Sequence, residues 1–225
     1  MSPLQTRETP QAPSSRDKIL DTCEALFARS GYAGVGLREV AEEVGLGKSS
    51  LFHHFASKQQ IYYEVLLRVL ERIEVNVAVA LGGDAASLSA TERLRRLGRG
   101  LVDALAEHPT SARLLLRALF EVEPFPHMDE PTAESRACDA VLESMIDAFG
   151  RLVLDGIASG EFREVSVPDT TTTMMGAAVF HFASGELGES LVGGSLYSAR
   201  AVARRRRELE SFFVHALVRP DRATD

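Results

Sequence analysis

The chain contains no tryptophan, only two cysteines and no excess of positive charge among its 225 residues. Cys23 and Cys138 are too few for a disulfide framework, and Cys23 falls on an apolar helical face, where a buried thiol is expected. No apolar run approaches the roughly 18 residues that cross a bilayer. Residues 1–14 contain several prolines but no apolar core of the kind that a signal peptide needs. These absences predict a cytoplasmic protein with a flexible N-terminal arm over residues 1–14 and no membrane partner.

The formal net charge of -7 argues against a protein that coats nucleic acid nonspecifically. Residues 15–60 carry six basic and six acidic side chains. Any affinity for DNA must therefore depend on where the charges are placed. The apolar share of 45% is ordinary for a globular protein and excludes wholesale disorder.

Apolar residues in the first third of the chain recur at helical spacing. The pattern predicts a first helix over 15–30 that ends at Gly31, and a second from Leu37 to Val44 that ends at Gly45. It predicts a third helix over 48–55 and a fourth from Ser57 to about residue 81. Ser57 and Gln60 fit a reciprocal capping box at the start of the fourth helix.

The remainder of the chain is also predicted to be helical. Leucines from Leu94 to Leu105 form one stripe, and a second stripe is formed by Leu115, Leu116, Leu119 and Phe120, followed by a loop over 124–131. A long helix is expected to end near Gly160, another to begin at Pro168, and a last one to run over about 195–218. No β-alternation extends beyond a few residues, so the predicted fold class is all-α.

Two short helices joined by a tight glycine-containing turn make a helix-turn-helix unit. The second helix of such a unit must expose small and polar side chains to base edges while its other side stays apolar. The third predicted helix fits, since polar side chains there accompany inward-facing Leu51 and Phe55. Lys58 stands at the start of the fourth helix, where free N–H groups and the helix dipole favour a phosphate.

The stretch from Ile19 to about residue 70 resembles the DNA-binding head of the TetR family of bacterial repressors. The matching elements are Ile19-Leu20, Ala25-Leu26-Phe27, Gly31-Tyr32, Val40-Ala41, Val44-Gly45-Leu46, Ser50-Leu51-Phe52-His53-His54-Phe55 and Ser57-Lys58. The resemblance implies a DNA-binding domain over 15–60 and a ligand-binding and dimerisation domain over 61–225, bridged by the helix over 57–81. It also implies a homodimer on palindromic double-stranded operator DNA, a small-molecule effector inside the body, and dimerisation through the last two long helices.

The resemblance assigns roles to residues of the head. Lys48, Ser49 and Ser50 would meet bases and phosphates, Phe52, His53 and His54 would lie along the groove, Lys58 would hold a phosphate, and Arg38 would reach base or backbone. The family usually has a threonine where Gly36 stands and a polar cap where Gly47 stands. Glycine is tolerated at an N-cap, but Gly36 lacks the hydroxyl with which that threonine usually contacts a phosphate.

Two sets of residues are candidates in the body. Apolar and methionine side chains are expected to line a ligand pocket or, equally, ordinary core; the set is Leu70, Ile73, Val77, Leu105, Leu116, Phe120, Met145, Phe149, Met175 and Val179, with Met174, Phe180 and Phe182 as further candidates. The last two helices carry more apolar residues than one core face needs, which predicts a dimer interface; that set is Leu187, Leu191, Leu209, Phe212 and Phe213, with Leu196 and Leu217 beside them.

Other interpretations are weaker. The stretch from Gly45 to Ser49 has Glu42 where a nucleotide-binding loop needs glycine, and it follows a helix rather than a strand. Adjacent His53 and His54 point about 100° apart and cannot chelate one metal, so no metal, cofactor or enzymatic activity is expected. The basic run over 204–207 is expected to be a solvated face that pairs with Glu208 and Glu210. Two alternatives remain: an enzyme or carrier with a vestigial head, and an architectural DNA binder without a ligand.

Overall fold

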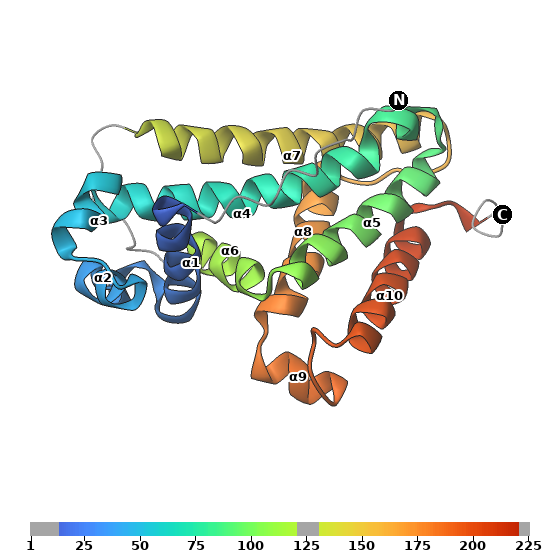
Figure 1. Ribbon diagram of the computed structural model, residues 1–225. Helices are drawn as coiled ribbons and strands as arrows, with labels where there is room; N and C mark the ends of the chain where they lie inside the picture. The colour runs from blue at the N-terminus through green and yellow to red at the C-terminus, as the bar shows by residue number, and fades with distance from the viewer. Residues whose placement is uncertain (1–13, 121–130, 221–225) are drawn as a thin grey trace, which may run out of the picture.

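The computed structural model describes residues 14–120 and 131–220. Over these residues the chain forms ten α-helices and a short 3-10 turn (Gly83–Ser87), and the only β-type pairing is an isolated bridge between Phe162 and Val218. None of the helices in this part of the chain is long and apolar enough to cross a membrane. The all-α fold class, with a helix-turn-helix head and a helical body, is confirmed (Figure 1).

Three helices form the head at one end of the molecule: α1 (Ser15–Gly34), α2 (Leu37–Val44) and α3 (Lys48–His54). Ser14 caps α1 through a reciprocal pair of hydrogen bonds with Asp17. The regular helix is interrupted at Gly31, where it was predicted to end, since Gly31 has non-helical angles (φ 71°, ψ 175°), and a further helical turn beyond this kink carries α1 on to Gly34. Glycine accepts this left-handed angle without steric cost, and the kink places Tyr32 against Phe27.

The long helix α4 (Lys58–Leu81) begins in the head and ends in the body. Ser57 accepts a hydrogen bond from the backbone N–H of Gln60 at 3.0 Å, as a capping serine should. The reciprocal half of the predicted capping box is wrong. The side-chain oxygen of Gln60 accepts from the N–H of Ala56 at 2.8 Å, one residue before the cap.

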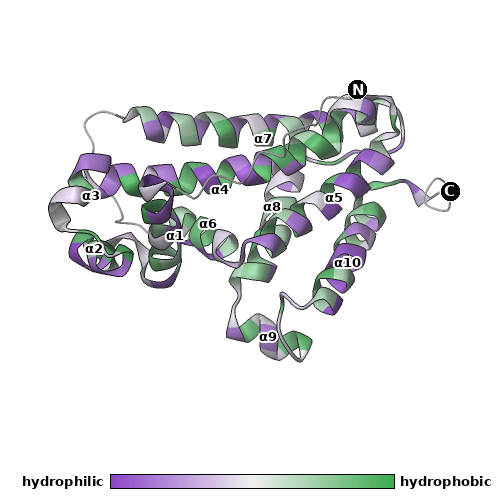
Figure 2. Cartoon of the chain, viewed as in Figure 1, coloured by the Kyte–Doolittle hydropathy of each residue, from purple (hydrophilic) through white to green (hydrophobic). Residues whose placement is uncertain are grey.

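Five further helices build the body around α4: α5 (Ala90–Glu107), α6 (Pro109–Phe120), α7 (Ala133–Ala158), α8 (Val167–Ala183) and α10 (Ala199–Leu217). Helices α4 and α7 lie side by side, and α5 packs between α4 and α10 (Figure 1). The apolar residues of each helix gather on the faces that these neighbours cover (Figure 2). Burial of such faces supplies most of the stability of a helical fold.

The C-terminal region departs from the sequence prediction. A short helix, α9 (Glu186–Val192), precedes the last one, and α10 begins only at Ala199. Glycines with positive φ stand on both sides of α9, at Gly185 and Gly193. They turn the chain sharply, so α9 stands apart from α8 and α10 (Figure 1). The two helices predicted near the C-terminus are therefore α8 and α10, and Leu187 and Leu191 belong to neither.

The buried face of α6 also differs from the predicted stripe. Leu114 is fully buried, Leu115 and Leu116 are half-buried, and Leu119 is 65% exposed. The side chain of Phe120 and the predicted loop over 124–130 lie outside the described residues. Helix α6 must present Ala112 and Leu114 to the core because its other faces contact the head and a cavity described below.

The basic run over 204–207 is not simply a solvated face. Arg205 donates to the backbone carbonyl of Ala177 on α8 at 2.6 Å, and Arg206 pairs with Asp103 on α5. The predicted acidic partner Glu210 pairs instead with Arg99 of α5, at 2.8 Å. Two of the arginines therefore join α10 to its neighbours.

Candidate DNA-binding surface and internal cavity

The turn between α2 and α3 has the geometry of a helix-turn-helix. Gly45 takes a left-handed conformation (φ 72°, ψ 29°), and its N–H closes α2 on the carbonyl of Ala41. A side chain at this φ would be strained. Buried Val40 on α2 and buried Leu51 and Phe55 around α3 then fix the angle between the two helices.

This packing decides which side chains of α3 point outward. Ser49, Phe52 and His53 are exposed, while Ser50 and His54 are half-buried. Phe52 is 44% exposed, although it is a large aromatic. The side chain of Lys48 lies outside the described residues. The outward face of α3 thus carries small, polar and aromatic groups, the types that read base edges and thymine methyls.

Arg38 stands on the exposed side of α2. Its Nε donates to the carboxylate of Glu42 at 3.0 Å, and the side chain is 88% exposed. An exposed pair of this kind is worth less than about 1 kcal/mol, so a phosphate can compete for the guanidinium. Neither N-cap glycine, Gly36 or Gly47, supplies a side-chain hydrogen bond.

Lys58 lies at the N-terminus of α4, with its Nζ 4.3 Å from the centroid of the Tyr32 ring. Burial lowers the pKa of Lys58 and raises the pKa of Tyr32. The Tyr32 ring in turn packs edge-on against Tyr62, at 5.2 Å between centroids. The ammonium is therefore held beside the start of α4 by an aromatic ring that follows the kink at Gly31. Sequence reasoning did not assign a role to Tyr32, although the Gly31-Tyr32 pair was part of the motif.

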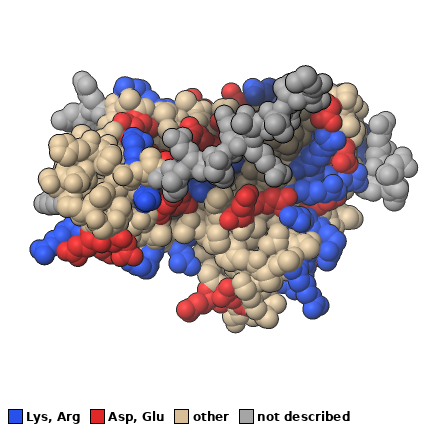
Figure 3. Space-filling model, in the orientation of Figure 1, with Lys and Arg blue, Asp and Glu red and all other residues tan. Residues whose placement is uncertain are grey.

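Charge on the head is local rather than extensive. In Figure 3 the visible face of the head is largely free of charged atoms, and basic and acidic groups adjoin along its lower edge. A second ion pair on the head, between Arg29 and Glu39, spans 3.4 Å. Binding to DNA would thus depend on a few placed cations, which agrees with the net charge of -7.

The body contains an apolar cavity of about 270 Å³, which residues of helices α4 to α8 line. Seven of the predicted ligand-contacting residues line it: Leu70, Ile73, Leu105, Met145, Phe149, Met175 and Val179. Residues of the same helices that sequence reasoning did not select also line it: Tyr63, Leu66, Leu101, Leu115, Ala118, Leu119, Cys138, Asp139, Leu142 and Ala178. Leu66 and Leu101 belong to the apolar stripes of the predicted helices, and this pattern could have identified them as cavity-lining residues.

Three predicted ligand contacts do not fit the cavity. Val77 lines a shallow groove on the outer side of α4 and α7, and Leu116 is half-buried away from the cavity. The side chain of Phe120 is not described. Among the further candidates, Met174 and Phe182 are buried in the core, and Phe180 is 56% exposed.

One end of the cavity is polar. Tyr63, Cys138 and Asp139 bring the only polar side chains to its described lining. The thiol of Cys138 donates to the backbone carbonyl of Tyr63 at 3.4 Å. Burial, with a smaller effect of neighbouring carboxylates, raises the pKa of Cys138 to about 12. The thiol therefore stays neutral, and it is not an activated nucleophile.

Cys23 is fully buried in the head, and burial raises its pKa to about 12 as well. In the described part of the chain, no cluster of His, Cys, Asp and Glu is arranged to hold a metal ion.

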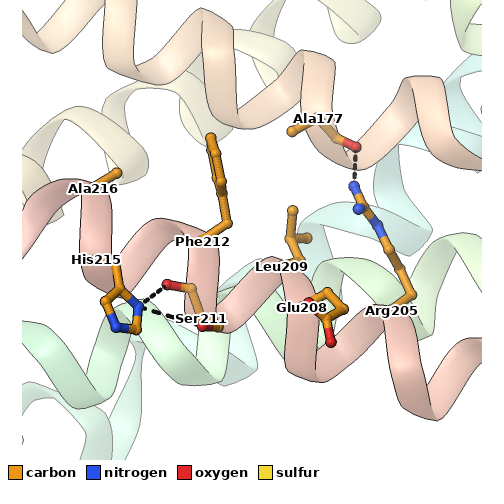
Figure 4. A pocket seen from close by; sticks show the side chains of 8 residues that line it. All are labelled: Ala177, Arg205, Glu208, Leu209, Ser211, Phe212, His215 and Ala216. Carbon is orange, nitrogen blue, oxygen red and sulfur yellow. Dashed lines mark hydrogen bonds between the residues drawn. The ribbon is translucent and has the colours of Figure 1, made fainter.

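A groove of about 700 Å³ runs between α8 and α10 on the outside of the body (Figure 4). The Phe212 ring stands in it and is 58% exposed.

Of the predicted dimer residues, Leu209 and Phe213 are buried in the chain's own core, at 1% and 2% exposure. Leu217 is buried in the same core, and Leu196, which precedes α10, is buried beside Gly188 of α9. The argument from excess apolar surface therefore fails for these four, because the protomer itself already covers them. Leu187 and Leu191 are exposed, but on α9.

A polar junction joins the head to the body. Glu24 of α1 is buried, pairs with Arg72 of α4 and accepts a hydrogen bond from the hydroxyl of Thr110 on α6 at 2.6 Å. Arg117, also on α6, donates to the backbone carbonyl of Ala28 at 3.2 Å. Helix α6 thus bonds to α1 at two points, and the same helix lines the cavity.

Family models match two parts of the chain. The model described as bacterial regulatory proteins of the tetR family matches residues 19–65, and that of the Tetracyclin repressor-like C-terminal domain matches residues 91–212. Together they cover more than half of the chain, from α1 to the middle of α10.

Individual relatives agree with these models. The HTH-type transcriptional regulator RutR of Escherichia coli (strain K12) is 27% identical over 179 residues, which are 79% of this chain and 78% of that protein. The structure of the ketosteroid transcriptional regulator KstR2 of Mycobacterium tuberculosis superposes with a TM-score of 0.72 at 19% identity, covering 95% of this chain and all of that one. The structure of AibR in complex with isovaleryl coenzyme A and operator DNA superposes with a TM-score of 0.69 at 15% identity, covering 88% of this chain and 97% of that one.

Proposed function

Because this chain belongs to the TetR family of bacterial regulatory proteins, we propose that it is a sequence-specific transcriptional repressor that a small, largely apolar ligand releases from a palindromic operator. The observation that carries the proposal is the recognition helix α3, which buried Leu51 and Phe55 hold so that Ser49, Phe52 and His53 face outward. The relatives are named as regulators rather than enzymes, and we assign no enzymatic activity to this chain. We place the protein in the cytoplasm, where its operator would be.

Contacts to DNA follow from the arrangement of the head. We assign base and groove contacts to Ser49, Ser50, Phe52, His53 and His54, and phosphate contacts to Lys48, Lys58 and Arg38. Lys58 combines its ammonium with the free N–H groups of α4, which together favour a phosphate. With few cations on the head, each phosphate anchor should make a measurable difference to the salt dependence of binding.

The experiment is a salt titration of operator binding. Selection from random double-stranded DNA would supply the operator, and fluorescence anisotropy would give the affinity at several salt concentrations. Lys58→Ala and Lys48→Ala should each weaken binding to all sequences alike and reduce the slope of log affinity against log salt by about one. Arg200→Ala, an exposed arginine at the start of α10, is the matched control and should leave the slope unchanged. An unchanged salt slope in both lysine variants would refute their assignment as phosphate anchors. If the selection from random DNA yields no sequence that the protein prefers, the result would favour an enzyme or carrier instead.

We place the dimer interface on the outer faces of α8 and α10, where Phe180 of α8 and Phe212, which lines the groove, are both more than half exposed. A two-fold axis there would bury both rings and present two α3 helices to a palindrome, one DNA turn apart. The protein should sediment as a dimer at micromolar concentration. Phe212→Ser should shift it toward monomer, whereas Val79→Ser, which changes an exposed apolar residue on α4, should not. A wild-type monomer under these conditions would overturn the proposal.

A further inference from the structure

The cavity is apolar except at one end. Apolar side chains from α4 to α8 make almost all of its lining, and no Lys, Arg or His is among the described residues that line it. Its polar side chains, Tyr63, Cys138 and Asp139, come from two neighbouring helices, α4 and α7. Cys138 and Tyr63 are joined by a hydrogen bond, and Asp139 is the next residue along α7. One end of the cavity is therefore polar, and the only charged group among the described lining residues is a carboxylate.

The surroundings reinforce this negative character. Besides burial, the carboxylates of Asp139, Glu71 and Glu134 all raise the pKa of the Cys138 thiol. The nearest arginine along α7, Arg136, is turned away and donates to the carbonyl of Pro131 at 2.6 Å. An anionic group in this cavity would find no cation to pair with among the described lining residues and would meet a field of its own sign.

An ammonium group would find favourable partners at the same end. Asp139 is exposed at the cavity edge, so its carboxylate is accessible to a ligand. Tyr63 adds an aromatic ring, whose face attracts cations when it is partly desolvated. The cavity of about 270 Å³ leaves room beside this end for the hydrocarbon part of a small ligand.

We propose that the effector is an apolar amine or quaternary ammonium compound, which places its hydrocarbon part among Leu70, Leu105 and Phe149 and its cationic end beside Asp139 and Tyr63. The inference rests on the proposed function, since it assumes that the cavity is the effector site. It goes further by fixing the charge of the ligand and the end of the cavity at which that charge lies. Carboxylates and phosphate esters of the same hydrocarbon should be rejected.

The test compares three ligands that share one hydrocarbon chain: octyltrimethylammonium, octanol and octanoate. Each would displace the neutral fluorescent probe N-phenyl-1-naphthylamine from the purified full-length protein. The cation should bind about tenfold or more tightly than octanoate, with octanol between them. Asp139→Asn should weaken the cation about fivefold, the upper range for a partly exposed charge pair, and should strengthen octanoate. The affinity for octanol should be the same in Asp139→Asn as in the wild type.

Glu143→Gln is the matched control, because it removes one exposed carboxylate from α7 one turn later and outside the cavity lining. It should leave all three affinities unchanged. Equal displacement by the three ligands, tighter binding of octanoate, or an unchanged cation affinity in Asp139→Asn would overturn the charge assignment while leaving the cavity as an effector site. Displacement by none of the three would overturn the cavity assignment as well, and operator binding, measured separately, would still report on the head.

Discussion

Tyr32 connects the backbone of the head to its chemistry at the scale of single residues. Its ring lies beneath the ammonium of Lys58 and packs against Phe27 and Tyr62. The ring reaches this place because Gly31 adopts a positive φ. We therefore regard Tyr32 as a residue that positions the phosphate anchor, and its effect on DNA binding should differ in kind from that of Lys58.

Tyr32→Leu should weaken operator binding about two- to fivefold, since an exposed cation–π contact is worth about 0.5–1 kcal/mol. The salt slope should stay as in the wild type, because the lysine charge is retained. Tyr32→Phe keeps the ring and should bind like the wild type. Anisotropy titrations over a salt series give both quantities, and thermal melts identify any general loss of packing. A Tyr32→Leu variant with full affinity would show that the ring does not position Lys58.

Residue-level roles were only partly predictable from the sequence. The outward positions of Phe52 and His53 follow from helical period once Leu51 and Phe55 are inward. The meeting of Tyr63 with Cys138 is different, because it depends on how α7 packs beside α4 across a long sequence separation. Periodicity assigns a side chain to a face of its own helix, and it does not determine which neighbour that face meets.

Helix α5 has an N-terminal cap that comes from a distant part of the chain. The carboxylate of Glu161, in the connection between α7 and α8, accepts from the N–H of Ala90 and of Thr91, both at 2.9 Å, and from the Thr91 hydroxyl at 2.8 Å. Partial burial by itself would raise the pKa of Glu161, but the hydrogen bonds from Thr91 and Ala90 outweigh it and lower the pKa below 4.5. The cap thus fixes the start of the helix whose Leu101 and Leu105 line the cavity.

Glu161→Gln should lower the free energy of unfolding by about 1 kcal/mol near neutral pH, the scale of a charge-assisted hydrogen bond with partial solvation. A carboxylate whose folded-state pKa is lowered stabilises the fold above its unfolded-state pKa, and the benefit disappears as the pH falls through the folded-state pKa. The difference between wild type and variant should therefore shrink below pH 4.5. Urea denaturation over a pH series measures it, with the exposed neighbour Glu164→Gln as control. A difference that persisted unchanged in acid would contradict the role of the charge.

Most helices were predicted because their apolar period and end signals agree. Exceptions arise where the local signal is weak or tertiary contacts decide. The seven-residue α9 lies between glycines, and its Leu187 and Leu191 were assigned to the last two long helices instead of to a helix of their own. The face that α6 buries is set by its bonds to the head through Thr110 and Arg117, which no local pattern contains. Leu209 and Phe213 were placed at a dimer surface because the sequence cannot tell which apolar face of α10 is already covered within the protomer.

Over the whole molecule, α6 is the element shared by the cavity and the head. It lines the cavity with Leu115, Ala118 and Leu119, and it bonds to α1 through the contact of Thr110 with Glu24. A ligand that displaced α6 would therefore disturb the placement of α1 and, with it, of α3. Such a ligand can shift the two arrangements of the head only by its differential affinity for them.

Operator and effector should weaken each other's binding by the same factor, about 5- to 150-fold, which corresponds to a coupling of about 1–3 kcal/mol. Calorimetry of an effector with and without operator, and anisotropy of operator with and without effector, give the two factors independently. Thr110→Val removes the hydroxyl that Glu24 accepts from while keeping the side-chain shape, so the coupling should fall toward unity with each separate affinity nearly retained. Thr172→Val, whose hydroxyl only bonds within α8, should keep the full coupling. Equal effector affinities with and without operator in the wild type would reject ligand release, however tightly the protein binds DNA, because linkage allows no one-sided effect.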